Sequence, residues 1–176
     1  EGIALFDEDE RLVFCNSQEY YEKPPTYVYV DPLGDTERVE LPADAARAGL
    51  LFDLTGDDYD DLVLGMWDNG IRADSNARIY FGSTEGLSER YQQQLAAPQC
   101  SSIAAGDFNG NGRVDLAFAT QGRLRVFYQS ALGFKPMRFV DLDIECEHLA
   151  AADLDGDGFA DLVVRNADGR IHICWG

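Results

Sequence analysis

The chain has 176 residues, of which 45% are hydrophobic and 11% aromatic, and 32 acidic against 14 basic side chains give it a net charge of -18. This hydrophobic content can build a folded core, but so acidic a chain has little to neutralise phosphates, so nucleic acid is excluded as an expected partner. No apolar run reaches the roughly 18 residues of a membrane-spanning helix, and no signal peptide is visible.

The first unit, residues 1–46, contains two segments with the composition of strands. Residues 3–16, IALFDEDERLVFCN, place apolar runs on both sides of an acidic turn. Residues 26–34, TYVYVDPLG, are β-branched and aromatic, as strands often are. The acidic turn has only Asp7 and Asp9 and lacks a closing carboxylate, so we assign no ion to it.

The next three units, residues 47–99, 100–145 and 146–176, repeat one pattern. In each, an apolar run leads into an Asp-rich loop, then Asp-Leu and more apolar residues, and a short β-like segment follows. A period near 50 residues with several short strands per unit is typical of β-propeller blades.

Two departures from the repeat stand out. The second unit carries about seven extra residues within residues 66–77, and the fourth unit ends before a last strand. An open sheet edge is usually covered in folded proteins. We therefore expect a piece of a longer propeller, or an edge completed by another segment or another chain.

The sequence thus predicts an all-β protein of antiparallel propeller blades, about four units in a single domain over residues 1–176, with the last blade incomplete. Helical patterning is confined to residues 43–50 and 88–97, where a turn or two of helix is expected before the next unit. We expect Tyr80 and Trp175 to pack between blades.

The three Asp-rich loops place oxygen atoms at alternate positions. Counting the first Asp as position 1, positions 1, 3, 5 and 9 supply side-chain oxygens and position 7 a backbone carbonyl. In chain order the candidate ligands are Asp53, Thr55, Asp57, Tyr59 and Asp61; Asp107, Asn109, Asn111, Arg113 and Asp115; and Asp153, Asp155, Asp157, Phe159 and Asp161. Ligands that are all oxygen favour Ca²⁺ over zinc or copper, and we expect two or three ions.

Glycine at positions 4 and 6 lets the backbone curl around an ion, because glycine tolerates a positive φ. The loop at residues 53–61 has Asp58 at position 6, so we expect it to bind more weakly. An EF-hand is excluded, since position 12 holds Leu64, Phe118 or Val164 in place of glutamate, and the flanks are strands. The alternative is that these are ordinary Asp/Asn/Gly turns, but the agreement of three loops favours a metal.

Residues 107–120, DFNGNGRVDLAFAT, and 153–166, DLDGDGFADLVVRN, resemble the FG-GAP or VCBS-type repeat of integrin α-subunit propellers and bacterial surface proteins. The resemblance implies four-stranded blades with Ca²⁺ in the hairpin between the first two strands. Such propellers usually have about seven blades, more than this chain supplies.

Cysteines and an insertion provide further candidate sites. Cys100 and Cys146 each lie seven residues before the first loop Asp, which favours either a disulfide between neighbouring blades or two buried thiols. Cys15 and Cys174 could pair only if the first and last units meet. In the insertion, Trp67, Asn69, Arg72 and Asp74 form either a recognition surface or a longer solvent loop.

Neither His148 nor His172 has a nucleophilic partner in evident context, so no enzyme activity is expected. We expect a calcium-stabilised, extracellular or cell-surface scaffold that binds a protein or glycan. The alternatives are a subunit that self-assembles through open blade edges into a filament or layer, and a non-catalytic domain of a secreted polysaccharide-active enzyme or lectin.

Overall fold

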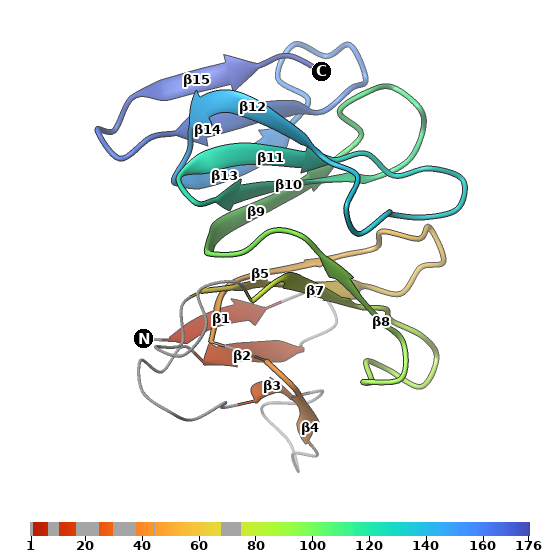
Figure 1. Cartoon of the computed structure of the whole chain (residues 1–176). Coiled ribbons are helices and arrows are strands. Elements are labelled where there is room, and N and C mark those ends of the chain that lie inside the picture. Colours follow the sequence, from red (N-terminus) through yellow and green to blue (C-terminus); the bar gives the residue numbers. More distant parts are fainter. Residues whose placement is uncertain (1, 7–10, 17–24, 30–37, 44, 68–74) are drawn as a thin grey trace.

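The computed structural model describes residues 2–6, 11–16, 25–29, 38–43, 45–67 and 75–176, with residues 2–6 described by their backbone alone. Within these ranges the chain forms strands and turns and has no helix. The strands form four antiparallel sheets, each made of strands that are consecutive in the sequence. Figure 1 shows the sheets following one another along the chain. The prediction of an all-β protein made of propeller blades is confirmed.

We call the four sheets blades 1 to 4. Blade 1 contains β1 (Gly2–Phe6), β2 (Leu12–Asn16), β3 (Thr26–Tyr29) and β4 (Arg38–Leu41). Blade 2 contains β5 (Ala46–Phe52), β6 (Asp61–Met66), β7 (Ala77–Tyr80) and β8 (Gln92–Leu95). Blade 3 contains β9 (Cys100–Gly106), β10 (Asp115–Thr120), β11 (Arg123–Phe127) and β12 (Val140–Glu145). Blade 4 has three strands, β13 (His148–Ala152), β14 (Asp161–Arg165) and β15 (Ile171–Cys174).

The pairing of the second and third strands has the same register in every blade. In every blade a leucine of the second strand lies opposite the last residue of the third strand: the pairs are Leu12–Tyr29, Leu62–Tyr80, Leu116–Phe127 and Leu162–Cys174. The next pairs along are Val13–Val28, Val63–Ile79, Ala117–Val126 and Val163–Ile173. This common register makes residues of different blades equivalent one to one.

The core lies between blades, because alternate residues of a strand point to opposite faces of its sheet. Val63 and Ile79 of blade 2 share one buried cluster with Phe118 and Phe127 of blade 3. We call the face that packs on the following blade the forward face, and the other the backward face. Fully burying each such side chain contributes about 1.5–3 kcal/mol relative to its exposure.

The other two interfaces follow the same rule. The forward face of blade 1 packs through Val13 and Val28 against Leu62 and Tyr80 of blade 2. The forward face of blade 3 packs through alanines and Val126 against Leu162 and Val164 of blade 4. Tyr80 therefore lies between blades as predicted. Trp175, by contrast, is 61% exposed, so its predicted packing is wrong in this structure.

The two predicted helical segments are strands. Residues 43–50 enter β5, which pairs with β6, and residues 88–97 contain β8, which pairs with β7. Ala46 and Leu95 are fully buried, whereas Gln92 and Gln94 are exposed. Packing between blades thus overrides the weak helical propensity of these segments.

Candidate calcium sites and a pocket at the opposite end of the blades

The three Asp-rich loops connect the first and second strands of blades 2, 3 and 4. Positions 4 and 6 of every loop have a positive φ: the residues are Gly56 and Asp58, Gly110 and Gly112, and Gly156 and Gly158. Two left-handed residues two positions apart fold the backbone back on itself, so that its N–H groups point inward. Asp58 adopts φ 68° although it carries a Cβ, which is an unfavourable conformation for most residues other than glycine.

The first Asp of each loop accepts these inward N–H groups. Asp53 Oδ1 accepts from Gly56 N at 2.7 Å, and its Oδ2 accepts from Asp58 N at 3.0 Å. Asp153 repeats both bonds, with Gly156 N at 2.7 Å and Gly158 N at 3.0 Å. Partial burial raises the pKa of Asp53, but the N–H groups of residues 55–58 outweigh it and leave that pKa below its usual value.

The Asp at position 9 is fully buried in each loop and fixes it to the blade. Asp61, Asp115 and Asp161 each accept from the backbone N–H of position 2, at 3.0, 3.2 and 2.9 Å. The second carboxylate oxygen accepts from the backbone after the third strand: Gly82 N, Gln129 N or Gly176 N, at 2.7, 2.8 and 2.9 Å. Each closing Asp therefore joins three parts of its own blade.

Burial also changes the protonation of two closing carboxylates. Burial raises the pKa of Asp61 to about 6, helped by the charges of Asp57 and Asp53 and opposed by the two backbone N–H groups. Burial likewise raises the pKa of Asp115 to about 6, with Asp107 adding to the shift. A cation beside these groups would favour the charged form.

The loop of blade 4 brings the most carboxylates together. One ligand oxygen from each of Asp153, Asp155 and Asp161 lies within 4.8 Å of the others, and among the described residues no other three acidic, histidine or cysteine side chains do so. Asp157 Oδ1 instead accepts from Phe159 N at 2.9 Å. The three oxygens lie close enough to one another to share a single cation, and carboxylate oxygens are the ligands that a hard cation prefers.

The loop of blade 3 differs at position 3. Asn109 Nδ2 donates to Asp115 Oδ2 at 2.7 Å, so its amide nitrogen, not its oxygen, faces the closing carboxylate. Asn111 Nδ2 donates to Gln129 O at 3.3 Å. Both amides would have to turn over to offer oxygen to an ion, whereas Asp107 already holds Gly112 N at 2.7 Å.

The loop of blade 2 keeps its three carboxylates apart. Asp57 Oδ1 accepts from Tyr59 N at 3.1 Å, and the Thr55 hydroxyl lies 3.5 Å from Asp53 Oδ1. In all three loops the position 7 residues, Tyr59, Arg113 and Phe159, have exposed side chains and contribute only a carbonyl as a candidate ligand. Asp7 and Asp9 of blade 1 lie outside the described residues.

Neighbouring loops contact one another. Ala160 N of the blade 4 loop donates to Asp107 O at 3.0 Å, and the Phe159 ring lies over Gly110, where a Cβ would approach it to 2.6 Å. Gln129 Nε2 donates to Leu54 O at 3.0 Å, and Arg11 pairs with Asp60 at 2.8 Å. The loops therefore form one continuous band across the blades.

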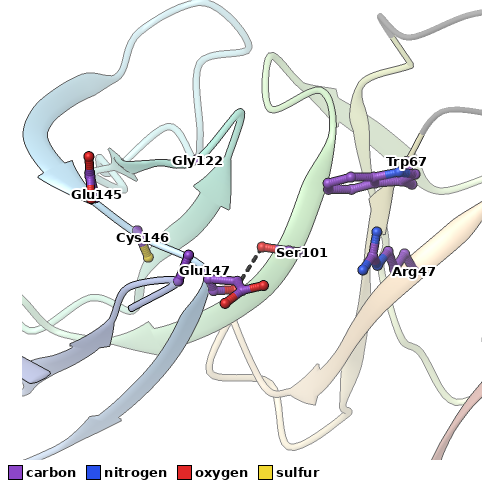
Figure 2. Close-up of a pocket in the computed structure, with 8 residues that line it drawn as sticks. Arg47, Trp67, Ser101, Gly122, Glu145, Cys146 and Glu147 are labelled. Atoms are coloured by element: carbon purple, nitrogen blue, oxygen red, sulfur yellow. Dashed lines mark hydrogen bonds between the residues drawn. The ribbon is translucent and has the colours of Figure 1, made fainter. Parts of the chain in front are cut away.

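A pocket of about 510 Å³ lies at the opposite end of the sheets. Its lining comes from the starts of first strands and from the connections after second and fourth strands: Arg47, Trp67, Ser101, Gly122, Glu145, Cys146, Glu147 and Ala167. In Figure 2, Arg47 and Trp67 lie on one side and Glu145 and Cys146 on the other. Ser101 Oγ donates to Glu147 O at 2.7 Å and joins blades 3 and 4 at the pocket.

Trp67 is the one predicted recognition residue that the structure describes. The Arg47 guanidinium carbon lies 4.1 Å from the centre of its indole ring, within range of a cation–π interaction. Asn69, Arg72 and Asp74 lie outside the described residues. The pocket thus combines a flat aromatic ring with a cation and nearby carboxylates.

The partners of Trp67 were not predicted from the sequence, although their positions in the repeat are periodic. Arg47, Ser101 and Glu147 each lie six residues before the first Asp of their loop, so they occupy equivalent places in three blades. Trp67 and Ala167 each lie six residues after the closing Asp. A position-by-position comparison of the repeats on either side of the Asp loops would therefore have identified all five of these pocket residues.

All four cysteines are free thiols, so neither predicted disulfide is present in the structure. Cys15 and Cys100 belong to the cores between blades 1 and 2 and between blades 2 and 3, whereas Cys146 and Cys174 pack between blades 3 and 4. Cys100 Sγ donates to Ser102 O at 3.4 Å and Cys146 Sγ to His148 O at 3.8 Å. Burial raises the pKa of Cys15, Cys100 and Cys146 to about 12, which keeps these thiols protonated.

Comparison with known proteins agrees with this architecture. The family model of the FG-GAP-like repeat matches residues 53–118 and 107–164, more than half of the chain. A solved structure described as that of the Dos1 propeller matches 97% of this chain and 44% of its own, with a TM-score of 0.63 at 12% identity. The chain therefore spans less than half of that propeller's length, and the likeness concerns the fold alone.

The resemblance inferred from the sequence is confirmed. No curated protein matches the chain. Within the described residues there is no helix of the length and apolarity needed to cross a membrane.

Proposed function

Because this chain belongs to the FG-GAP-like repeat family, we propose that it is a calcium-stabilised, non-enzymatic propeller scaffold that binds a protein or glycan outside the cell. The observation that carries the calcium assignment is the convergence of Asp153, Asp155 and Asp161 within 4.8 Å. Three anionic oxygens at this spacing repel one another unless a cation lies between them.

The residues present suit a calcium ion. Every candidate ligand is an oxygen, and the paired left-handed residues shape each loop into a tight turn around its first Asp. The ion would supply positive charge that offsets the repulsion within the loop. Asp153 and Asp161 would hold it while continuing to accept their backbone N–H groups, so binding would stiffen the hairpin.

The calcium affinity expected of these loops also indicates where the protein acts. Extracellular calcium modules bind with Kd on the order of 10⁻⁴–10⁻³ M, a range that only calcium-rich surroundings saturate. Positions 3 to 7 of each loop are exposed to solvent, which fits weak binding of this kind. We therefore place the protein outside the cell or on its surface.

The pocket supports the binding part of the proposal. Trp67 offers an apolar ring for the C–H face of a sugar or for an apolar side chain, while Arg47 and Glu147 offer opposite charges beside it. The connections that form this end of the blades are held by sheets, and binding residues often lie on loops that a rigid scaffold positions.

Calcium binding is tested by isothermal titration and by thermal melts with about 2 mM Ca²⁺ or excess EDTA. We expect two or three ions per chain and a lower melting temperature on chelation. Asp155→Ala should remove one ion, because Asp155 bonds only Asp157 N at 3.1 Å besides facing the site. Asp168→Asn, in an exposed turn, makes the same change of charge elsewhere and should bind as the unchanged protein does. Coincident melts with no heat of binding would refute the assignment.

Ligand binding is tested on a glycan array and a panel of extracellular proteins. A ligand that uses the pocket should lose at least about tenfold in affinity with Trp67→Ala, since Trp67 is the aromatic residue of the lining. Tyr91→Ala is the matched control, because Tyr91 is an exposed aromatic residue outside the pocket. Equal losses for both variants would mean that the pocket is not the binding site.

A further inference from the structure

The loop of blade 3 contains two exposed Asn-Gly pairs, Asn109–Gly110 and Asn111–Gly112. An asparagine followed by glycine is especially open to deamidation, because glycine has no Cβ to shield its backbone nitrogen from the neighbouring side-chain amide. A third such pair, at residues 69–70, lies outside the described residues. Blade 3 thus carries two chemically identical pairs whose surroundings can be compared.

The two glycine nitrogens of this loop are held differently. Gly112 N donates to Asp107 Oδ2 at 2.7 Å, whereas Gly110 N makes no hydrogen bond within the described part of the chain. In the loops of blades 2 and 4 the equivalent nitrogens, those of Gly56 and Gly156, each donate to the first Asp at 2.7 Å. The loop of blade 3 therefore leaves free a nitrogen that the other two loops hold.

Deamidation of Asn109 needs no reagent other than water. Gly110 N attacks Cγ of Asn109 and passes its proton through water to the side-chain nitrogen, which leaves as ammonia when its bond to Cγ breaks. Water then adds to either carbonyl of the five-membered succinimide ring and opens it to aspartate or isoaspartate. The attack is intramolecular and gains from proximity. At Asn111 the same attack would first have to break the bond from Gly112 N to the Asp107 carboxylate.

The aspartate product would carry a carboxylate where an amide now closes the loop. Asn109 Nδ2 donates to Asp115 Oδ2 at 2.7 Å. An ionised carboxylate at residue 109 has no proton to donate, so it would repel the buried carboxylate of Asp115. In blade 4 the equivalent residue is Asp155, whose oxygen lies within 4.8 Å of oxygens of Asp153 and Asp161. Deamidation thus gives blade 3 the same three carboxylates as blade 4.

We propose that Asn109 is a deamidation site, and that its conversion to aspartate turns the loop of blade 3 from an amide-closed turn into a carboxylate-lined calcium loop. The second half rests on the proposed calcium function. The first half does not, since the reaction requires only Asn109, Gly110 and water. Because the number of charged ligands tunes the calcium affinity of such loops, the deamidated loop binds its ion more tightly.

Peptide mapping by tandem mass spectrometry tests the modification in the folded chain, incubated with EDTA at mildly alkaline pH. Asn109 should lose its amide at least about fivefold faster than Asn111, and the two rates should become similar in urea, where neither glycine nitrogen is held. Asn111 is the internal control, since it is also exposed and also precedes glycine. No loss at Asn109, equal rates in the folded chain, or faster loss at Asn111 would overturn the proposal.

The variant Asn109→Asp supplies the aspartate product for calcium measurements. Isothermal titration should show one ion bound at least about tenfold more tightly than in the unchanged protein. The melting temperature of this variant should be lower in EDTA, where two carboxylates face each other, and should rise more when calcium is added. Gln94→Glu makes the same amide-to-carboxylate change at an exposed position of β8 and should bind calcium as the unchanged protein does.

The outcomes separate this inference from the proposed function. If Asp155→Ala removes an ion but Asn109→Asp gains no affinity, the calcium function stands and the conversion of the blade 3 loop is wrong. If no variant binds calcium, that conversion fails together with the calcium function, and the mapping alone decides whether Asn109 is modified. Deamidated protein separated by ion exchange replaces Asn109→Asp if circular dichroism shows that the variant does not fold.

Discussion

The first and last carboxylates of each loop have opposite surroundings. Asp53 is the first residue of the blade 2 loop, where several backbone N–H groups stabilise its charge and lower its pKa. Asp61 is buried under the same loop, and burial raises its pKa to about 6. The pair therefore combines a carboxylate whose charged form is stabilised with one whose pKa is raised to about 6. The sequence alone shows two aspartates eight positions apart and cannot show this difference, because burial depends on the neighbouring strands.

Asp58 is the residue that departs most from the loop pattern. Its φ of 68° is left-handed, and it adds a negative charge between Asp53 and Asp57. Asp58→Gly should raise the free energy of unfolding by roughly 0.5 kcal/mol, because glycine relieves the strained backbone, although it also loosens the unfolded chain. The reciprocal change, Gly158→Asp, should lower it. Urea denaturation of both variants checks the prediction, and a loss of stability in Asp58→Gly would contradict it.

At the scale of elements, the hairpins were predictable and the outer strands were not. The β-like runs at residues 26–34, 78–83 and 124–130 correspond to β3, β7 and β11, because alternating apolar residues specify a buried strand wherever it packs. The sequence of β8, QQQL, has no such alternation. It becomes a strand because β7 offers it an edge and Leu95 reaches the core.

The side-chain interactions at blade junctions also could not be predicted from the sequence pattern. Arg125 forms a bidentate ion pair with Asp141, at 2.6 and 2.8 Å, and stacks on Phe139 at 3.6 Å. Its third nitrogen donates to Ala96 O in the connection from blade 2. Three contacts of one side chain to distant parts of the sequence require the fold to be known first. The Asp loops needed no such knowledge, because their ligands are local.

At the scale of the molecule, blades are stabilised by their neighbours more than by themselves. The three buried clusters all lie between sheets, and the Asp loops and the Arg11–Asp60 pair add polar contacts across the same boundaries. Each blade is a unit that cannot bury its apolar faces alone, as in other repeat proteins. A substitution in one loop should consequently change the stability of all four blades.

Acidity provides a test of this coupling, because lowering the pH should stabilise the calcium-free protein and weaken the stabilisation by calcium. Without calcium, Asp61 and Asp115 have pKa values of about 6, above the 3.8 of a free Asp, so the folded state binds more protons between these values. Stability should therefore rise as pH falls from 7 to 5, and decline again below about pH 4 as Asp53, whose pKa is lowered, becomes protonated. With calcium, protons compete with the ion for Asp61 and Asp115, so the gain in melting temperature from calcium should shrink over the same range. Thermal melts at pH 5 and 7, each with calcium and with EDTA, measure both effects. A chelated protein that is less stable at pH 5 than at pH 7 would show that the buried carboxylates do not govern the acid response.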